Sequence, residues 1–397
     1  DQYGRYGGSD LDWLNRIVSR DDGLFWVAGF SASTDHFGPL TRGNWDALVG
    51  IVDEDGQLMW GHRAGSSGRD AFLDAEVVGS EMVTVGYCGG ADFETPENRG
   101  DLDVWVLSLS GVGNLNWSTV FGGSGADECF DLAATMDGGW MVAGRSASGD
   151  GDIGQNRGAD DMLLMKMDAN GVPQWHRTYG GSATEYGIQV QPNAAGYLLG
   201  GWTLSSDGEV WGHAGGIDIW ILQLDAAGDT LWTRTYGGSG DAVLLSMKMA
   251  QNGDFFLAGF TENEGDEAGG KDVVLMKCGA NGEVLWQEKY GGSADDVAFY
   301  MEELSDGRLL MSGYTASSDG DIKRNGGGQD AWLLWTDANG QLLGESTRGQ
   351  ELNDLALHFC EDPEGGFRVA GMIESDREGV PVGGELGDAW TFKWNFE

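Results

Sequence analysis

Acidic residues alternate with glycine in several loops of this sequence, and this pattern could bind calcium. The clearest examples place Asp150 and Asp152 on either side of one glycine, and Asp319 and Asp321 on either side of another. Calcium takes about six to eight oxygen ligands, which closely spaced carboxylates supply. The sequence therefore predicts these four aspartates as candidate calcium ligands. No glutamate closes a loop of EF-hand length, so an acidic turn without a metal is the alternative interpretation.

Aromatic and imidazole side chains in comparable loops are candidate ligand-binding residues. Phe37 and Trp45 flank one such loop, Phe93 lies in a second, and Trp211 and His213 lie in a third. Flat aromatic rings on exposed loops bind sugars or proteins through their apolar faces. Packing of the same side chains over neighbouring strands is the alternative interpretation.

Signatures of catalysis are absent from the sequence. None of the five histidines forms a metal-binding pair such as HxH or HExxH. The sequence also contains no GxSxG elbow, phosphate-binding loop or dinucleotide fingerprint. We therefore predict no catalytic residue and no required cofactor, with calcium as the one possible ion.

These loops belong to a unit of sequence that recurs seven times. A Gly-Gly-Ser turn, degraded in two copies, returns every 54 to 58 residues, a period typical of propellers and solenoids. The approximate repeats are 6–63, 64–120, 121–178, 179–235, 236–289, 290–347 and 348–397 together with 1–5. The whole chain, 1–397, is therefore predicted to be one domain.

Each repeat has the apolar pattern of four short strands. In the third copy, period-two or continuous apolar runs cover 129–136, 140–146, 162–167 and 173–178, separated by turns rich in Gly, Asp and Asn. The seventh copy lacks its fourth strand, and residues 1–5 precede the first Gly-Gly-Ser as a fourth strand would. The sequence therefore predicts an all-β fold: a single seven-bladed β-propeller with four antiparallel strands per blade, whose last blade is closed by the N-terminal strand.

Residues that recur in every copy are expected to serve the fold, because a catalytic group is needed only once. An aspartate opens the third strand of each copy: Asp46, Asp103, Asp161, Asp218, Asp272, Asp330 and Asp388. A second acid follows each Gly-Gly-Ser turn: Asp12, Asp70, Asp127, Glu185, Asp241, Asp296 and Asp354. Such acids accept hydrogen bonds from turn amides. A glycine in the second strand, such as Gly144, is expected to allow close packing.

Composition excludes several classes of partner. The 64 acidic and 23 basic residues leave a net charge of −41, which opposes binding to nucleic acid or an anionic lipid surface. No apolar run is long enough for a membrane helix, so we predict no direct membrane insertion. The cysteines Cys88, Cys129, Cys278 and Cys360 fit no metal or disulfide framework. We expect free buried thiols, with a contact between Cys88 and Cys129 as the alternative.

One stretch of the sequence resembles a known group of repeat proteins. Residues 317–334 read Ser-Ser-Asp-Gly-Asp-Ile, then Gly-Gly-Gly-Gln-Asp-Ala-Trp-Leu-Leu, and Asp-Ala-Asn-Gly and Tyr-Gly-Gly-Ser recur nearby. This pattern is similar to repeats of secreted and cell-surface proteins of Bacteroidota, many of which use type IX secretion. The resemblance implies a propeller and an extracytoplasmic location, secreted or at the cell surface of a Gram-negative bacterium. It also implies that a sorting domain was cleaved or that a partner holds the chain at the outer membrane.

These observations predict a non-enzymatic propeller that binds or assembles with other cell-surface or outer-membrane proteins. Two alternatives stay open. One is an enzyme acting on polysaccharide, a hydrolase or lyase, with carboxylates at the channel mouth. The other is a calcium-stabilised protein that binds glycans. An enzyme would place acids that break the sevenfold pattern in a pocket.

Overall fold

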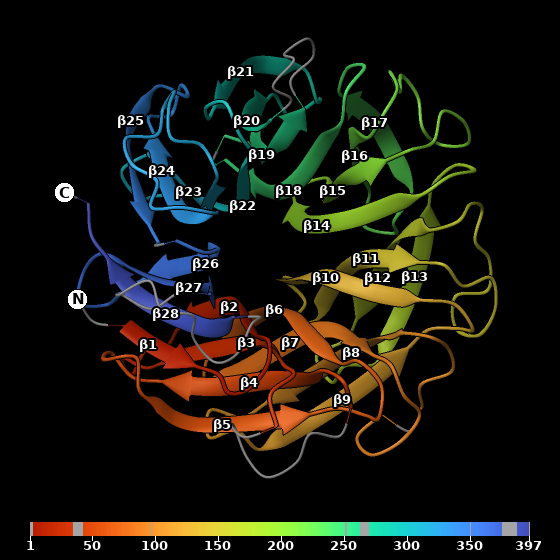
Figure 1. Cartoon of the computed structure of the whole chain (residues 1–397). Helices are drawn as coiled ribbons and strands as arrows, with labels where there is room; N and C mark the ends of the chain where they lie inside the picture. The colour runs from red at the N-terminus through yellow and green to blue at the C-terminus, as the bar shows by residue number, and fades with distance from the viewer. Residues whose placement is uncertain are drawn as a thin grey trace. The chain divides into compact units, whose positions relative to one another are not determined.

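The fold is a seven-bladed β-propeller, as the sequence predicts. The computed structural model describes residues 3–34, 43–95, 97–250, 252–262, 270–349, 351–374 and 387–396. Over these residues the chain forms 28 strands and no helix, arranged as seven four-stranded antiparallel sheets (Figure 1). Consecutive strands pair within each sheet, so every sheet is one blade of the propeller.

The blades are numbered in chain order, and the strands of a blade are called a to d. Blade 1 contains β2 (Asp12–Ser19), β3 (Phe25–Ser31), β4 (Asp46–Val52) and β5 (Leu58–Ala64). Blade 2 contains β6 (Ala71–Val78), β7 (Glu81–Cys88), β8 (Asp103–Leu109) and β9 (Leu115–Phe121). Blade 3 contains β10 (Asp127–Ala134), β11 (Trp140–Ser146), β12 (Asp161–Met167) and β13 (Pro173–Tyr179).

The remaining blades follow the same plan. Blade 4 contains β14 (Glu185–Asn193), β15 (Gly196–Thr203), β16 (Asp218–Leu224) and β17 (Thr230–Tyr236). Blade 5 contains β18 (Ala242–Met249), β19 (Phe255–Glu262), β20 (Lys271–Cys278) and β21 (Val284–Tyr290). Blade 6 contains β22 (Asp296–Glu303), β23 (Leu309–Thr315), β24 (Asp330–Thr336) and β25 (Leu342–Arg348). Blade 7 contains β26 (Asp354–Glu361), β27 (Phe367–Ile373), β28 (Asp388–Trp394) and, as strand d, β1 (Tyr3–Tyr6).

The chain separates into two compact units. The first comprises residues 1–156, 163–178 and 357–397, and the second comprises residues 157–162 and 179–356. The first unit holds blades 1 and 2 and most of blades 3 and 7. The second holds blades 4, 5 and 6. Each unit is described by itself below.

Burial follows the order of strands within a blade. In blade 1, both β3 and β4 are buried at every position, because both faces of these central strands are covered. Strand d of the same blade, β5, is mostly exposed or half-buried. Apolar runs without alternation therefore mark strands b and c, and mixed sequences mark strand d.

A β-bulge in strand a explains the glycine of strand b. The register of β10 against β11 shifts between Cys129 and Asp131, which pushes the backbone of β10 toward β11. A Cβ at Gly144 would overlap the carbonyl oxygen of Glu128. The same overlap with strand a recurs at Gly29, Gly86, Gly201, Gly259 and Gly313. The glycine is therefore required by a bulge inside its own sheet, and not by packing between sheets, as the sequence suggested.

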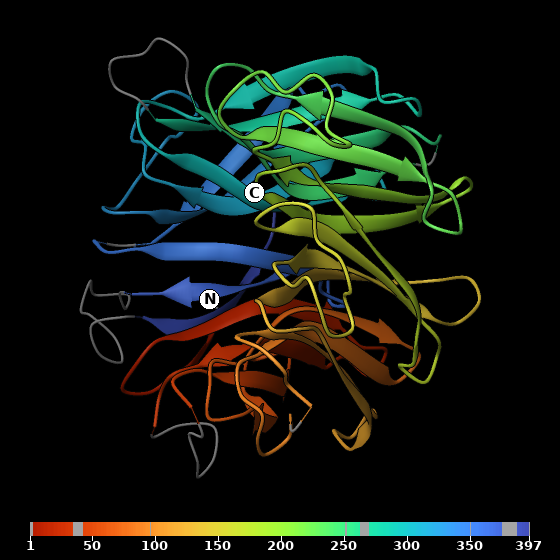
Figure 2. The same cartoon turned by 90° about the vertical axis from the view of Figure 1, so that its right-hand side faces the viewer.

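Blade 7 joins residues from the two ends of the sequence. Within the first unit, β1 pairs with β28 in antiparallel register, with Tyr3 opposite Phe392 and Tyr6 opposite Ala389 (Figures 1 and 2). Arg5 also forms an ion pair with Asp388. The predicted closure of the last blade by the N-terminal strand is thus present in the structure.

Neighbouring blades within each unit are tied through the turn between strands c and d. The hydroxyl of Tyr6 donates to the carbonyl of Gly56 at 2.6 Å, and that of Tyr236 donates to Gly282 at 2.8 Å. The indole of Trp232 lies directly beneath Gly282, where φ is +81° and a Cβ would be crowded. Each tie therefore uses a tyrosine of strand d against one glycine of the next blade, and the tie at Gly282 adds the tryptophan of the same strand.

Candidate functional site

Pairs of carboxylates meet at the linkers between blades. The first aspartate of strand c faces the first acid of the next strand a across the first glycine of the linker. A Cβ at Gly122 would lie 2.6 Å from Oδ1 of Asp103 and 2.8 Å from Oδ2 of Asp127. Within the second unit, Asp161 and Glu185 face Gly180 in the same way.

The carboxylate of the acid in strand a accepts hydrogen bonds, and in Asp127 both oxygens do so. Oδ2 of Asp127 accepts bonds from the amide of Gly123 at 2.8 Å and from the hydroxyl of Ser148 at 2.7 Å. The hydroxyl of Ser146 donates to its other oxygen. Equivalent bonds from the linker amide reach Asp12, Asp70, Glu185 and Asp296. These acids therefore organise the linkers, as their repetition predicts.

The acid of strand c is less completely paired. Asp103 accepts one bond from the amide of Arg99 at 2.8 Å, whereas its Oδ1 is buried with no hydrogen-bond donor among the described residues. Burial, reinforced by the charge of Asp127, raises the pKa of Asp103 to about 6. Burial and the facing Glu185 raise the pKa of Asp161 to about 6 in the same way.

The four predicted calcium ligands lie over these linkers. Asp150 Oδ1 accepts the amide of Ser124 at 2.7 Å, and Asp319 Oδ1 accepts the amide of Ser293 at 2.8 Å. Asp321 Oδ2 accepts the amide of Gly291 at 3.1 Å. Asp152 forms an ion pair with Arg99. The loop between strands b and c thus folds back and caps the preceding linker.

The same contacts bear on the calcium hypothesis. A carboxylate oxygen that accepts an amide hydrogen is oriented toward that amide, which satisfies it without an ion. Across the described ranges, no group of three or more His, Cys, Asp or Glu side chains is placed to hold a metal ion. Calcium binding by Asp150, Asp152, Asp319 and Asp321 stays a prediction.

Among the predicted aromatic residues of the first unit, Trp45 packs and Phe93 is exposed. The ring of Trp45 stacks on Phe30 with centroids 4.8 Å apart, and the guanidinium of Arg69 lies 5.5 Å from its centroid. Phe93 is 62% exposed and adopts φ +49°, a strained backbone for a bulky residue. Phe37 lies outside the described residues.

Trp211 and His213 lie on the loop between strands b and c of blade 4. Trp211 is 74% exposed, and its carbonyl accepts the hydroxyl of Thr235 at 2.9 Å. His213 Nε2 donates to the carbonyl of Gly216 at 2.9 Å, and the following residue donates its amide to Asp218. The histidine therefore shapes the loop, while the indole is presented to solvent.

The linker between blades 4 and 5 breaks the sevenfold pattern. Counting five residues on from its first glycine, Gly237, reaches Ala242, where six other linkers carry Asp or Glu. Ala242 opens β18 and pairs with Thr261. Asp241, assigned from the sequence to the repeated acid set, lies one residue earlier and accepts the amide of Ile217 at 2.8 Å. That assignment was wrong, because Asp241 lies one residue closer to the first glycine of its linker than the repeated acid does in the other six linkers.

A cavity of about 380 Å³ occupies this broken linker. The missing carboxylate leaves the hydroxyl of Thr261 buried without a hydrogen-bond partner among the described residues. In blade 4 the corresponding hydroxyl, of Thr203, donates to Glu185 at 2.8 Å. The cavity is also lined by Thr235, Asp241, Glu262, Gln287 and Lys289. We call it the 4/5 cavity, and it is the candidate functional site.

Sequence reasoning did not single out the 4/5 cavity, although the signal was present. Aligning the seven linkers on their first glycine places Ala242 in a column of acids. Of the residues predicted to bind ligand, Trp211 is joined to the cavity wall through Thr235. The other wall residues depart from the repeat too little to be recognised without coordinates.

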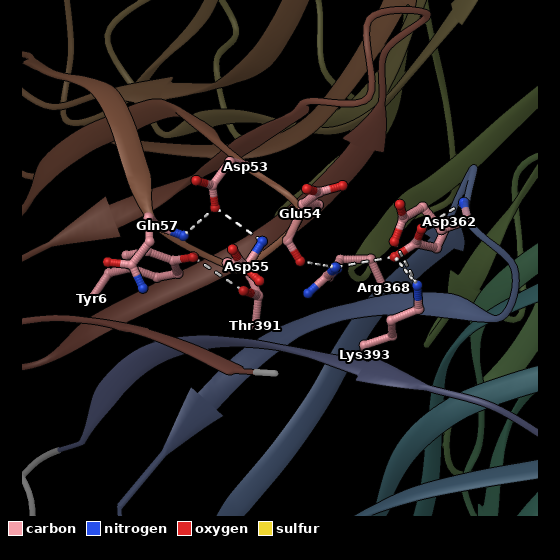
Figure 3. A network of polar contacts seen from close by, with 10 residues as sticks. Tyr6, Asp53, Glu54, Asp55, Gln57, Asp362, Arg368, Thr391 and Lys393 are labelled. Atoms are coloured by element: carbon pink, nitrogen blue, oxygen red, sulfur yellow. Dashed lines mark hydrogen bonds and ion pairs between the residues drawn. The ribbon is translucent and has the colours of Figure 1, made fainter. Parts of the chain in front are cut away.

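A buried arginine in the first unit was also missed. Arg368 lies three residues before the glycine of strand b, where the other blades carry apolar side chains. It is fully buried, donates to the carbonyl of Glu54, and lies 3.0 Å from Asp362 (Figure 3). Lys393 lies 3.4 Å from the same carboxylate. The arrangement ties blade 7 to the turn between β4 and β5.

The four cysteines are free. Cys88, Cys129 and Cys278 are buried, and burial raises the pKa of the Cys88 and Cys278 thiols to about 12. These thiols are therefore protonated packing groups at neutral pH. No helix in the described part of the chain has the length and apolar character to cross a membrane.

Comparison with known proteins relates segments of this sequence to two curated proteins. A segment of 139 residues is 30% identical to the regulatory protein FlaEY of Caulobacter vibrioides, covering 31% of this chain and 15% of that protein. A segment of 88 residues is 33% identical to an uncharacterized protein of Aquifex aeolicus, covering 21% of this chain and 26% of that protein. The matches thus span about a quarter or less of these relatives. No family model matches the chain.

Solved structures with a similar backbone share the fold. The Pan2 WD40 domain of Neurospora crassa aligns over the whole chain and 99% of its own, with TM-score 0.50 and 12% identity. Sqt1 of Chaetomium thermophilum aligns over 99% of each chain, with TM-score 0.53 and 13% identity. The Synechocystis apocarotenoid oxygenase aligns over 98% of this chain and 94% of its own, with TM-score 0.50 and 12% identity. At these identities the likeness shows the fold alone.

Proposed function

We propose that this propeller is a non-enzymatic module that binds another protein. The observation that carries the proposal is an exposed aliphatic residue that recurs at the second position of strand d. In the second unit, Leu231, Leu285 and Leu343 are 56%, 50% and 51% exposed. Each is the second residue of its strand d. In the first unit, Met59 of β5 is exposed in the same position.

These side chains lie on strands that end their sheets. The sheet order places β17, β21 and β25 at an edge. An edge strand offers backbone amides and carbonyls to a partner segment, and the exposed leucines add apolar surface to the same strand. Covering a solvent-exposed leucine with a partner lowers the free energy of the complex. This combination is suited to protein binding more than to chemistry on a small substrate.

The similarity to WD40 folds is consistent with such a role, because a rigid propeller presents many loops and edges to partners. The partner class expected from the sequence is another cell-surface or outer-membrane protein. The acidic surface, with a net charge of −41, would favour a partner with a basic patch. The extracytoplasmic location rests on the resemblance of the repeats, and fractionation of cells with an antibody to the native protein tests it.

A paired affinity experiment tests the protein-binding role. Wild-type protein and a triple variant, Leu231→Ser, Leu285→Ser and Leu343→Ser, are immobilised and exposed to an envelope extract of the native cells. We expect a defined protein to be retained by the wild type and lost by the variant in quantitative mass spectrometry. A control, Val78→Ser with Met136→Ser, changes exposed side chains at turns between strands a and b. Retention that is equal on all three proteins would refute the role of strand d.

A further inference from the structure

The 4/5 cavity lies in the linker whose sequence lacks the repeated acid, and its wall combines acidic, basic and neutral hydrogen-bonding side chains. We infer that it binds one unit of a neutral saccharide. This role does not depend on protein binding by the exposed leucines, although β17 and β21 also contribute residues to the cavity wall. The inference starts from the missing carboxylate at Ala242, which opens about 380 Å³ beside the linker Gly237–Gly240. That volume is in the range of small-molecule pockets.

Charge in the cavity wall restricts the ligand. Asp241 and Glu262 bring two carboxylates, and the chain as a whole carries a net charge of −41, so an anion would be repelled. Lys289 lies in the same wall and offsets part of this negative charge. A neutral ligand rich in hydrogen-bonding groups can pair with the carboxylates and with the ammonium group of this wall.

Hydrogen-bonding capacity then points to a sugar. Carboxylates accept hydrogen bonds, an ammonium group donates them, and the amide of Gln287 and the hydroxyl of Thr235 do both. Sugar hydroxyls also donate and accept, so such a mixed wall can pair with several of them. The hydroxyl of Thr261, buried without a partner among the described residues, adds one further group to be satisfied.

The backbone of the loop that carries the exposed Trp211 contacts the cavity wall. The carbonyl of Trp211 accepts the hydroxyl of Thr235, a cavity-wall residue, and the amide of Ile217 at the end of the same loop donates to Asp241, another wall residue. Both ends of the Trp211 loop segment are therefore anchored to the wall. The exposed indole offers an apolar face for the C–H groups of a pyranose ring.

Affinity electrophoresis with defined polysaccharides tests the inference. Native gels containing soluble glucan, xylan, mannan or galactan are run with the full chain, and retardation shows binding. We expect at least one of these polymers to retard the wild type. Trp211→Ala should weaken binding about tenfold, because stacking on the indole is lost. Phe93→Ala, which removes an exposed aromatic outside the cavity wall, should leave the mobility shift unchanged.

A second variant fills the cavity and keeps the fold. Ala242→Asp restores the acid that six other linkers carry, next to a hydroxyl that can donate to it. We expect an unchanged or raised melting temperature together with loss of retardation. Gln287→Ala, on the exposed part of β21, is the alternative variant if Ala242→Asp does not fold.

The outcomes separate this inference from the proposed function. The saccharide site is overturned if none of the four polymers retards the wild type. It is also overturned if the wild type, Trp211→Ala, Ala242→Asp and Gln287→Ala are retarded equally. Neither result contradicts protein binding by strand d. Shortening of a retained polymer, measured as released reducing ends, would support saccharide occupancy and overturn the non-enzymatic role. Loss of binding in Ala242→Asp with normal strand d binding supports both.

Discussion

Asp103 and Asp127 face each other across the α-carbon of Gly122, and Asp103 keeps one buried oxygen without a hydrogen-bond donor among the described residues. Two ionised carboxylates in such a position repel each other, and burial adds a desolvation cost. The pair therefore favours a protonated Asp103 at mildly acidic pH. Asp161 and Glu185 form a second pair of this kind in the other unit.

The first prediction is that mild acid stabilises the protein. The pKa of Asp103 and of Asp161 is about 6 in the folded chain, above the value of about 4 of an unfolded aspartate. Between these values the folded state binds more protons, so the free energy of unfolding rises as pH falls from 7 to about 4. We expect the melting temperature to increase over this window. In Asp103→Asn with Asp161→Asn the slope should flatten, and an unchanged slope would contradict the assignment.

The second prediction concerns the glycine of strand b. Gly144→Ala should destabilise the protein by about 3 kcal/mol or more, because its Cβ would overlap the carbonyl of Glu128 at the bulge. Chemical denaturation measures the loss. Gly149→Ala is the matched control, since its Cβ would meet no atom within 4 Å. Similar stabilities of the two variants would show that the bulge can relax.

The third prediction distinguishes a linker cap from a calcium site. Asp150→Asn keeps an oxygen that can accept the amide of Ser124, whereas Asp150→Ala removes it. If Asp150 serves only as a linker cap, the melting temperature falls in the alanine variant and holds in the asparagine variant, with no difference between calcium chloride and EDTA. A calcium-dependent rise that Asp150→Asn abolishes would instead establish the calcium site predicted from the sequence.

The fourth prediction addresses the buried ion pair of blade 7. Arg368→Met leaves Lys393 as the one charged partner of Asp362 among the described residues and removes the bond to the carbonyl of Glu54. We expect a loss of about 3 kcal/mol in the free energy of unfolding. Adding Asp362→Leu should recover part of that loss, which a double-mutant cycle by urea denaturation measures. Strictly additive effects would show that the two side chains are not coupled.

The architecture could be predicted from the sequence because each blade repeats the same turn chemistry. The Gly-Gly-Ser linker, the acids on either side of it and the glycine of strand b recur at fixed spacing, so errors in one copy are corrected by the others. The apolar runs of β3 and β4 also identify strands buried on both faces. The number of strands and their pairing followed from this repetition.

The candidate site could be predicted only in part, because it arises where the repetition fails. Trp211 was recognised as an unusual loop residue, but its tie to Thr235 depends on how the loop folds. Asp241 follows a Gly-Gly-Ser turn as the repeated acids do, but the structure places it one residue out of register with them. Arg368 occupies a position that is apolar in the other blades, and its role became clear only from its hydrogen bond to Asp362.

The pairing of β1 with β28 joins segments that are nearly the whole of this sequence apart. Residues near position 5 must wait for residues near position 390 before their backbone groups find partners. During translation, β1 therefore emerges as an orphan strand, exposed to premature association with other nascent chains. A long-range closure of this kind is expected to slow folding, because the chain must bring β1 and β28 together from a large separation in sequence.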